Sequence, residues 1–270
     1  MNIPSYHFPL SIQTVLPEHY REDKAFHHHL STLQQLGLYG VELNMADPQK
    51  VDIADVQDFL STFELKLTMF ASGLTAKTFQ LSLSSPDPEV RQRSVSKCRD
   101  IIDVVEGADA GIILGFMKGP AAPDVHEARA RFVESLRAIS PYAADKQVPI
   151  LVEATNRYES AVANSLADTV ELIQEFDNPF IRILPDTFHM NIEEADALAA
   201  LAQYASYYDS LHISDNNRFF PGFGAIRFEE YVQFLKDHEY QGGVAIEGNI
   251  KESFVDDVTA SAEYLRPFLT

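Results

Sequence analysis

Short runs of apolar residues alternate with longer amphipathic runs along the whole chain. The short runs predict strands at residues 8–13, 39–43, 66–71, 111–115, 149–152, 181–184, 210–213 and 243–246. The amphipathic runs predict helices at residues 23–36, 53–63, 88–106, 124–146, 163–175, 193–204, 228–237 and 253–268. Most strand runs are apolar throughout, which is typical of strands that are covered on both faces.

This alternation predicts an α/β protein in which residues 1–270 form a single (β/α)8 barrel. A doubly wound open sheet is the alternative, but no glycine-rich phosphate-binding motif follows the first strand run. The two longest irregular stretches, 72–86 and 216–226, each follow a strand run. Because the loops after the strands carry the chemistry of such a barrel, both stretches are candidates for a lid or for substrate contact.

Four strand runs in the second half of the chain end at a potential metal ligand. These ligands are Glu153, Asp186, His212 and Glu247, and they lie roughly 30 residues apart, the length of one strand and its crossover helix. One ligand per unit brings all four to the same mouth of the barrel. Any one acidic residue could simply cap a helix, but four in consecutive units favour a shared metal site. Three carboxylates and one imidazole suit Mn²⁺, Mg²⁺ or Co²⁺, with Zn²⁺ as a further occupant in a crystal.

Charge and composition narrow the choice of partners. The chain has 21 Lys and Arg against 40 Asp and Glu, a net charge of −19. Such a surface repels phosphate backbones, so nucleic acid is not an expected partner. No apolar run approaches the ~18 residues of a membrane span. The single cysteine, Cys98, cannot form an internal disulfide, and the first residues lack a signal-peptide pattern, so we expect a cytoplasmic protein.

Polar strings flank the four potential ligands. They are Asn156-Arg157-Tyr158-Glu159, the run from Asp186 to Glu194, and the run from His212 to Arg218 with Pro221-Gly222-Phe223-Gly224. These strings resemble the ketose 3-epimerase branch of the xylose isomerase-like TIM barrels, which includes the D-tagatose and D-psicose 3-epimerases. Within that branch the match looks closest to the 5-keto-L-gluconate epimerase type, which acts on ketouronates.

The resemblance implies a divalent-metal-dependent epimerase of a ketose or ketouronate. Glu153, Asp186, His212 and Glu247 would hold one metal ion, and Glu153 and Glu247 would also be the acid/base pair. Such an enzyme inverts the carbon next to the carbonyl through an enediolate, which two carboxylates on opposite faces make possible. An aldose–ketose isomerase and a metal-dependent dehydratase are the alternatives on the same scaffold.

The resemblance also implies substrate contacts and an assembly. Glu159, His189 and Arg218 would contact oxygens of a small sugar or sugar acid, and a homodimer or homotetramer is common in this family. Two further residues are ambiguous from the sequence alone. Lys118, at the end of the fourth strand run, either meets an anionic group of the substrate or is a solvated lysine. Glu42, in the second strand run, either bonds to substrate or pairs with a neighbour inside the barrel.

Overall fold

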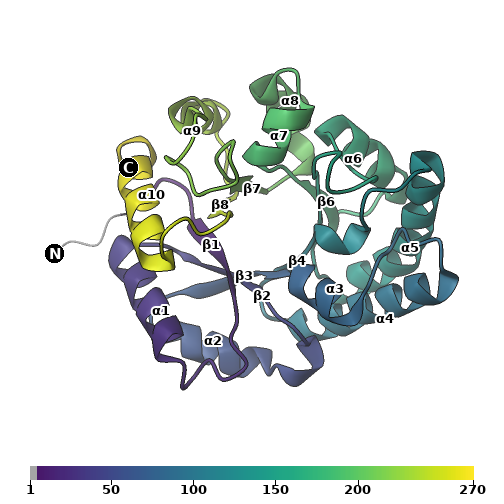
Figure 1. Ribbon diagram of the computed structural model, residues 1–270, viewed down its shortest axis with the longest axis horizontal. Helices are drawn as coiled ribbons and strands as arrows, with labels where there is room; N and C mark the ends of the chain where they lie inside the picture. The colour runs from purple at the N-terminus through teal and green to yellow at the C-terminus, as the bar shows by residue number, and fades with distance from the viewer. Residues whose placement is uncertain (1–4) are drawn as a thin grey trace.

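Eight parallel strands ringed by helices make up the computed structural model, which describes residues 5–270 (Figure 1). The strands are β1 (Leu10–Val15), β2 (Gly40–Asn44), β3 (Lys66–Ala71), β4 (Gly111–Leu114), β5 (Ile150–Glu153), β6 (Ile181–Leu184), β7 (Ser210–Ile213) and β8 (Gly243–Ile246). The helices are α1 (Lys24–Leu36), α2 (Ile53–Ser61), α3 (Gly73–Phe79), α4 (Pro88–Val105), α5 (Val125–Lys146), α6 (Leu166–Ile173), α7 (Thr187–Glu193), α8 (Ala197–Gln203), α9 (Phe228–Asp237) and α10 (Phe254–Leu269). Within these residues no helix is long and apolar enough to cross a membrane.

The strands follow one another around the sheet in the order β6-β5-β4-β3-β2-β1-β8-β7. The seam between β6 and β7 is closed by a single bridge between Asp186 and His212, where the His212 amide donates to the Pro185 carbonyl at 2.9 Å. The predicted (β/α)8 barrel is therefore confirmed. The seam itself is made by two of the predicted metal ligands.

A small apolar cluster fills the inside of the barrel. It consists of Ala71, Ile113, Leu151 and Leu184, one residue from each of β3 to β6. Because side chains alternate along a strand, the residue two positions later points to the same side. Glu153 comes two residues after Leu151, and Asp186 comes two after Leu184. The carboxylates therefore stand on an apolar floor at the carboxyl ends of the strands.

The predicted irregular stretch 72–86 is wrong in part, because it contains helix α3. The side chain of Asn44, from β2, accepts the Leu74 amide at 3.1 Å near the start of this helix. Because this hydrogen bond comes from a strand about 30 residues earlier, the residues around α3 give no sign in the sequence of where the helix begins. The second stretch, 216–226, contains no helix or named strand, as predicted.

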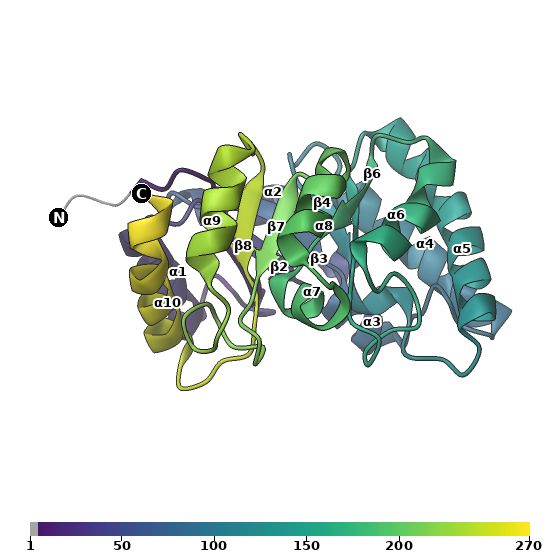
Figure 2. The ribbon, with the colours of Figure 1, turned by 90° about the horizontal axis from the view of Figure 1, so that it is seen from above.

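The helix predicted at 193–204 is confirmed in part, because α8 lies within it, but a separate short helix, α7, precedes it and was not predicted. Asp186 caps α7, since its Oδ1 accepts the Phe188 amide at 2.7 Å. Helix α7 thus begins directly after a predicted metal ligand. Helices α3 and α7 lie at the same edge of the barrel, beside the carboxyl ends of the strands (Figure 2).

Candidate metal centre and its pocket

The structure brings the four predicted metal ligands together. One ligand atom from each of Glu153, Asp186, His212 and Glu247 lies within 4.8 Å of all the others. The first three residues are buried, and the Glu247 side chain is 18% exposed. They come from β5, the end of β6, β7 and the end of β8. The cluster is therefore shielded on the barrel side and open toward the mouth.

An unsatisfied carboxylate oxygen tests whether this cluster fits a metal ion. Within residues 5–270, Oε1 of Glu153 is buried and has no hydrogen-bond partner. His189 Nε2 lies 3.6 Å away and His212 Nδ1 lies 3.9 Å away. An unpaired buried carboxylate oxygen is costly, whereas a hard divalent cation binds such an oxygen directly. The donor set thus fits a divalent metal.

The two glutamates of the cluster differ in their electrostatic surroundings before any metal binds. Burial, together with the nearby negative charge of Glu247, raises the pKa of Glu153 to about 8. Burial would also raise the pKa of Glu247, but Arg218 and His212 outweigh it and hold that pKa well below its usual range. The metal-free site therefore distinguishes the two carboxyl groups by their surroundings.

His212 is held between two carboxylates. Its Nε2 lies 2.8 Å from Glu42 Oε2, and its Nδ1 lies 2.7 Å from Glu247 Oε2. Burial lowers the pKa of His212, but Glu42 and Glu247 outweigh burial and raise it well above its usual value. Glu42 is itself buried in β2, so it pairs inside the barrel and does not face the pocket. A carboxylate that accepts a hydrogen bond from Nε2–H orients the ring and leaves Nδ1 for a metal.

Arg218 links two of the ligands. Its guanidinium donates to Asp186 Oδ2 at 2.6 Å and pairs with Glu247 Oε1 at 2.9 Å. The Arg218 backbone has a φ of 64°, in the left-handed region that non-glycine residues seldom adopt. Strain of this kind persists where the surroundings fix the residue, and it concentrates at functional sites. Arg218 borders the pocket, where part of its guanidinium can reach a ligand.

The loop that carries Arg218 is shaped by one buried carboxylate. Asp215 accepts backbone N–H groups of Asn216, Gly222, Gly224 and Ile226 at 2.7–3.0 Å. A Cβ on Gly224 would lie 2.3 Å from the Asp215 carboxylate, so only glycine fits there. Residues 221–224 thus belong to a loop that wraps around Asp215.

His189 is oriented toward Glu153 by its neighbour. The backbone N–H and the side-chain Nδ2 of Asn156 lie 3.2 and 2.8 Å from His189 Nδ1. Two donors at Nδ1 make that nitrogen an acceptor, so the proton sits on Nε2. Burial lowers the pKa of His189, which favours the neutral ring. Asn156 also donates to Glu159 Oε1 at 2.9 Å, and His189 and Glu159 both line the pocket.

Lys118 is placed away from the pocket. Its side chain is 0% exposed, and Nζ donates to the carbonyls of Glu153 and Ala163 and to Thr155 Oγ1. Burial lowers the pKa of Lys118 to about 7, against the opposing charges of Glu153 and Glu159. Neither sequence alternative describes this residue, because it is neither solvated nor directed at a ligand. It ties the loop after β5 to the barrel and so positions the backbone of Glu153.

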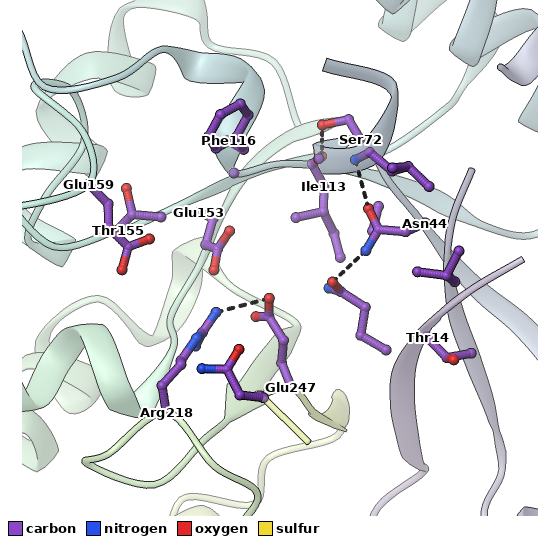
Figure 3. Close-up of a pocket in the computed structure, with 18 of the residues that line it drawn as sticks. Thr14, Asn44, Ser72, Ile113, Phe116, Glu153, Thr155, Glu159, Arg218 and Glu247 are labelled. Atoms are coloured by element: carbon purple, nitrogen blue, oxygen red, sulfur yellow. Dashed lines mark hydrogen bonds and ion pairs between the residues drawn. The ribbon is translucent and has the colours of Figure 1, made fainter. Parts of the chain in front are cut away.

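Two residues of the cluster, Glu153 and Glu247, line a pocket of about 610 Å³ at the barrel mouth. In Figure 3, Glu153, Glu247 and Arg218 lie together within it, with Glu159 on one side and Asn44 on the other. The wall is mixed, because it combines the carboxylates with apolar side chains such as Ile113. A few convergent polar groups in a partly apolar pocket are typical of small-molecule sites.

Comparison with protein families matches residues 30–268 of this chain to the xylose isomerase-like TIM barrel. Among curated proteins, the L-ribulose 3-epimerase of Methylomonas sp. is 29% identical over 214 residues, which cover 77% of this chain and 72% of that protein. The D-psicose 3-epimerase of Ruminiclostridium cellulolyticum is 30% identical over 195 residues, 68% of this chain and 67% of that protein. The 3-dehydro-D-guloside 4-epimerase of Escherichia coli is 36% identical over 118 residues, 44% of this chain and 45% of that protein.

Solved structures give the same architecture. An L-ribulose 3-epimerase superposes with a TM-score of 0.80 at 20% identity, covering 95% of this chain and 92% of that one. The apo 3-keto-D-glucoside 4-epimerase of E. coli superposes with a TM-score of 0.78 at 23% identity, covering 97% and 98%. At these identities the superpositions support the fold alone. The curated relatives confirm the branch that the sequence resemblance predicted.

Proposed function

Because this chain belongs to the xylose isomerase-like TIM barrel family, we propose that it is a metal-dependent epimerase that inverts the carbon next to a ketose carbonyl. Its curated relatives are named epimerases, so the prediction of an enzyme of the sugar isomerase/epimerase class is confirmed. The placement of Glu153 and Glu247 is the observation that supports the proposed mechanism of inversion. Both belong to the ligand cluster and both border one pocket (Figure 3), and they come from β5 and from the end of β8, which are not neighbours in the sheet.

The proposed reaction removes a proton from one face of the substrate and adds a proton to the opposite face. A divalent metal held by Glu153, Asp186, His212 and Glu247 would supply Lewis-acid polarisation of the carbonyl, which makes the neighbouring C–H acidic. One glutamate then removes that proton, and the other returns a proton to the opposite face. Which glutamate acts first depends on the direction of the reaction.

Two further side chains are suited to the negative charge that develops on the substrate oxygens. His189 offers its Nε2–H as a neutral donor, because Asn156 occupies its Nδ1. Arg218 offers a fixed guanidinium whose other contacts hold it in place. Donors that are positioned before the reaction lower the barrier without reorganisation. Glu159, which borders the pocket beside Asn156, is proposed to accept a substrate hydroxyl.

The charges around the pocket favour a neutral ketose over a ketouronate or a sugar phosphate. Arg218 is already paired with Asp186 and Glu247, and Lys118 is buried on backbone carbonyls. Lys77, on α3, is exposed at the rim. Among the described residues that line the pocket, Lys77 is the one lysine or arginine without a carboxylate partner, so an anionic group placed beyond the metal has little positive charge to pair with.

A substrate panel tests the proposed function. The protein is incubated with Mn²⁺ and with free ketoses, ketose phosphates or ketouronates, and the products are identified by NMR. We expect inversion at the carbon next to the carbonyl, with the highest rate for neutral ketoses. Exclusive formation of aldoses would identify an isomerase instead, and loss of one water from the substrate would identify a dehydratase.

A further inference from the structure

A glycine occupies the position next to Glu153 in the neighbouring strand. Strands β4 and β5 pair so that Ile113 lies opposite Leu151. Two residues further along, this register places Gly115 beside Glu153. Because side chains alternate along a strand, a side chain at position 115 would point to the inside of the barrel, as that of Ile113 does. The inward position beside this glutamate therefore carries no side chain.

The missing side chain leaves room for the carboxylate of Glu153. A Cβ added to Gly115 would overlap Glu153 Oε2 and would lie 3.4 Å from Glu153 Cδ. Gly115 is buried and borders the pocket. The other oxygen, Glu153 Oε1, lies 3.6 Å from His189 Nε2 and 3.9 Å from His212 Nδ1. The two oxygens thus have different neighbours, since Oε1 faces the ligand cluster and Oε2 lies against Gly115.

The turn that follows Gly115 holds the backbone of the same glutamate. Residues Phe116–Lys118 form a single helical turn, in which the Lys118 amide donates to the Gly115 carbonyl at 3.1 Å. Lys118 Nζ donates to the main-chain carbonyl of Glu153. Phe116 lies above Glu153 in Figure 3. Residues 115–118 therefore support Glu153 at two points, its carboxylate and its carbonyl.

From this geometry we propose that Gly115 is a positioning residue for proton transfer by Glu153. The space at Gly115 lets the carboxylate turn so that Oε1 faces the metal ligands while Oε2 stays at the pocket wall, within reach of the substrate. A side chain at position 115 would displace Oε2, and a shift of about 1 Å in a reacting group lowers a rate roughly 10²-fold. The atoms nearest to the added Cβ belong to Glu153 and not to Glu247. This inference rests on the proposed epimerase function and adds a residue that serves one of its two glutamates.

Deuterium exchange, measured separately for two epimers, tests this inference. The probes are the best ketose of the substrate panel and its epimer, each in D₂O with saturating Mn²⁺. The proton next to the carbonyl faces a different glutamate in each epimer, so exchange into the unconverted substrate depends on that glutamate. Glu153→Gln and Glu247→Gln identify which epimer each glutamate serves. We expect Gly115→Ala to slow exchange roughly 10²-fold in the epimer that Glu153→Gln impairs, and to leave exchange in the other epimer near the wild-type rate.

Thermal unfolding of the metal-free protein gives a second readout that requires no activity. Gly115→Ala should lower Tm by roughly 2–10 °C, the effect of an overpacked site in a chain of this size. In a Glu153→Ala background the same substitution should change Tm little, because no carboxylate remains to be displaced. If Gly115→Ala does not fold, the double variant Gly115→Ala/Glu153→Ala should still fold.

Gly243→Ala is the matched control. Gly243 begins β8, and the nearest heavy atom to a Cβ added there is the Pro9 carbonyl oxygen at 3.9 Å, an ordinary contact. This variant should keep the wild-type Tm and both exchange rates. The inference is overturned, and the proposed function left standing, if Gly115→Ala slows both epimers equally or neither of them. An equal loss of Tm with and without the Glu153 carboxylate, or a double variant that does not fold, would also overturn it. A wild-type protein that exchanges no ketose would overturn both proposals.

Discussion

Replacing Glu153 or Glu247 by glutamine is expected to lower kcat by roughly 10²- to 10⁴-fold, the usual contribution of a positioned acid or base. Glutamine keeps the size of the side chain and one oxygen that can bind a metal, but it cannot accept and return a proton. Both glutamates border the same pocket, so the loss of either one interrupts proton transfer on one face of the substrate. The measurement is kcat in both directions of the epimerisation at saturating Mn²⁺.

A charge-matched control separates this effect from the loss of a negative charge in general. Glu175→Gln removes an exposed carboxylate that pairs with Arg137 on the surface, and it should keep kcat within about twofold because surface changes rarely matter. Circular dichroism should show an unchanged fold for all three variants. Activity near the wild-type level in Glu153→Gln or Glu247→Gln would refute the acid/base assignment.

Removing the metal is expected to abolish turnover and to lower the thermal midpoint by about 5–10 °C. A metal present at 100 times its Kd raises the free energy of unfolding by about 2.7 kcal/mol, and this stabilisation is lost when the metal is removed. Each kcal/mol of stability shifts Tm by about 2–4 °C in a chain of this size. The protein loses stability without the metal because three carboxylates and one imidazole lie within 4.8 Å of one another, and the carboxylates then repel each other. Dialysis against a chelator, followed by scanning calorimetry and an activity assay, measures both effects.

Adding Mn²⁺ back should restore activity and Tm together. Asp186→Asn serves as the comparison, because it weakens the ligand set while preserving the side-chain volume and the acceptor that caps α7. Its Tm should respond little to Mn²⁺. A chelated wild-type protein that retains full turnover would show that the cluster works without a metal ion.

The main features of the site are visible in the sequence because they are local. Glu153, Asp186, His212 and Glu247 each lie within or just after the last residues of a strand run, and the geometry of a parallel barrel is enough to bring such positions to one mouth. The bounds of the strands also follow from short apolar runs between helices. Side chains alternate between the two faces of a strand, and this alternation explains why the carboxylates point to the inside of the barrel.

The features that the sequence did not reveal depend on partners far away in the chain. Glu42 bonds to His212 across 170 residues, and β2 and β7 are not neighbours in the sheet. Lys118 reaches the Glu153 carbonyl from 35 residues away, so its burial could not be read from its own surroundings. Helix α3 is capped by Asn44 from β2. In each case a contact with a residue far away in the sequence decides what the side chain does, and the sequence around that residue gives no sign of this contact.

The most direct test of the account is the fate of the proton at the inverted carbon. The wild-type protein with Mn²⁺ is given a neutral ketose in D₂O, and the epimer formed in the first turnovers is examined by NMR for deuterium at that carbon. Proton transfer through Glu153 and Glu247 predicts a deuterium atom from solvent in most product molecules, because a carboxyl group that faces the open mouth exchanges with water. Epimer that forms while retaining the original hydrogen at the inverted carbon would contradict the two-glutamate mechanism.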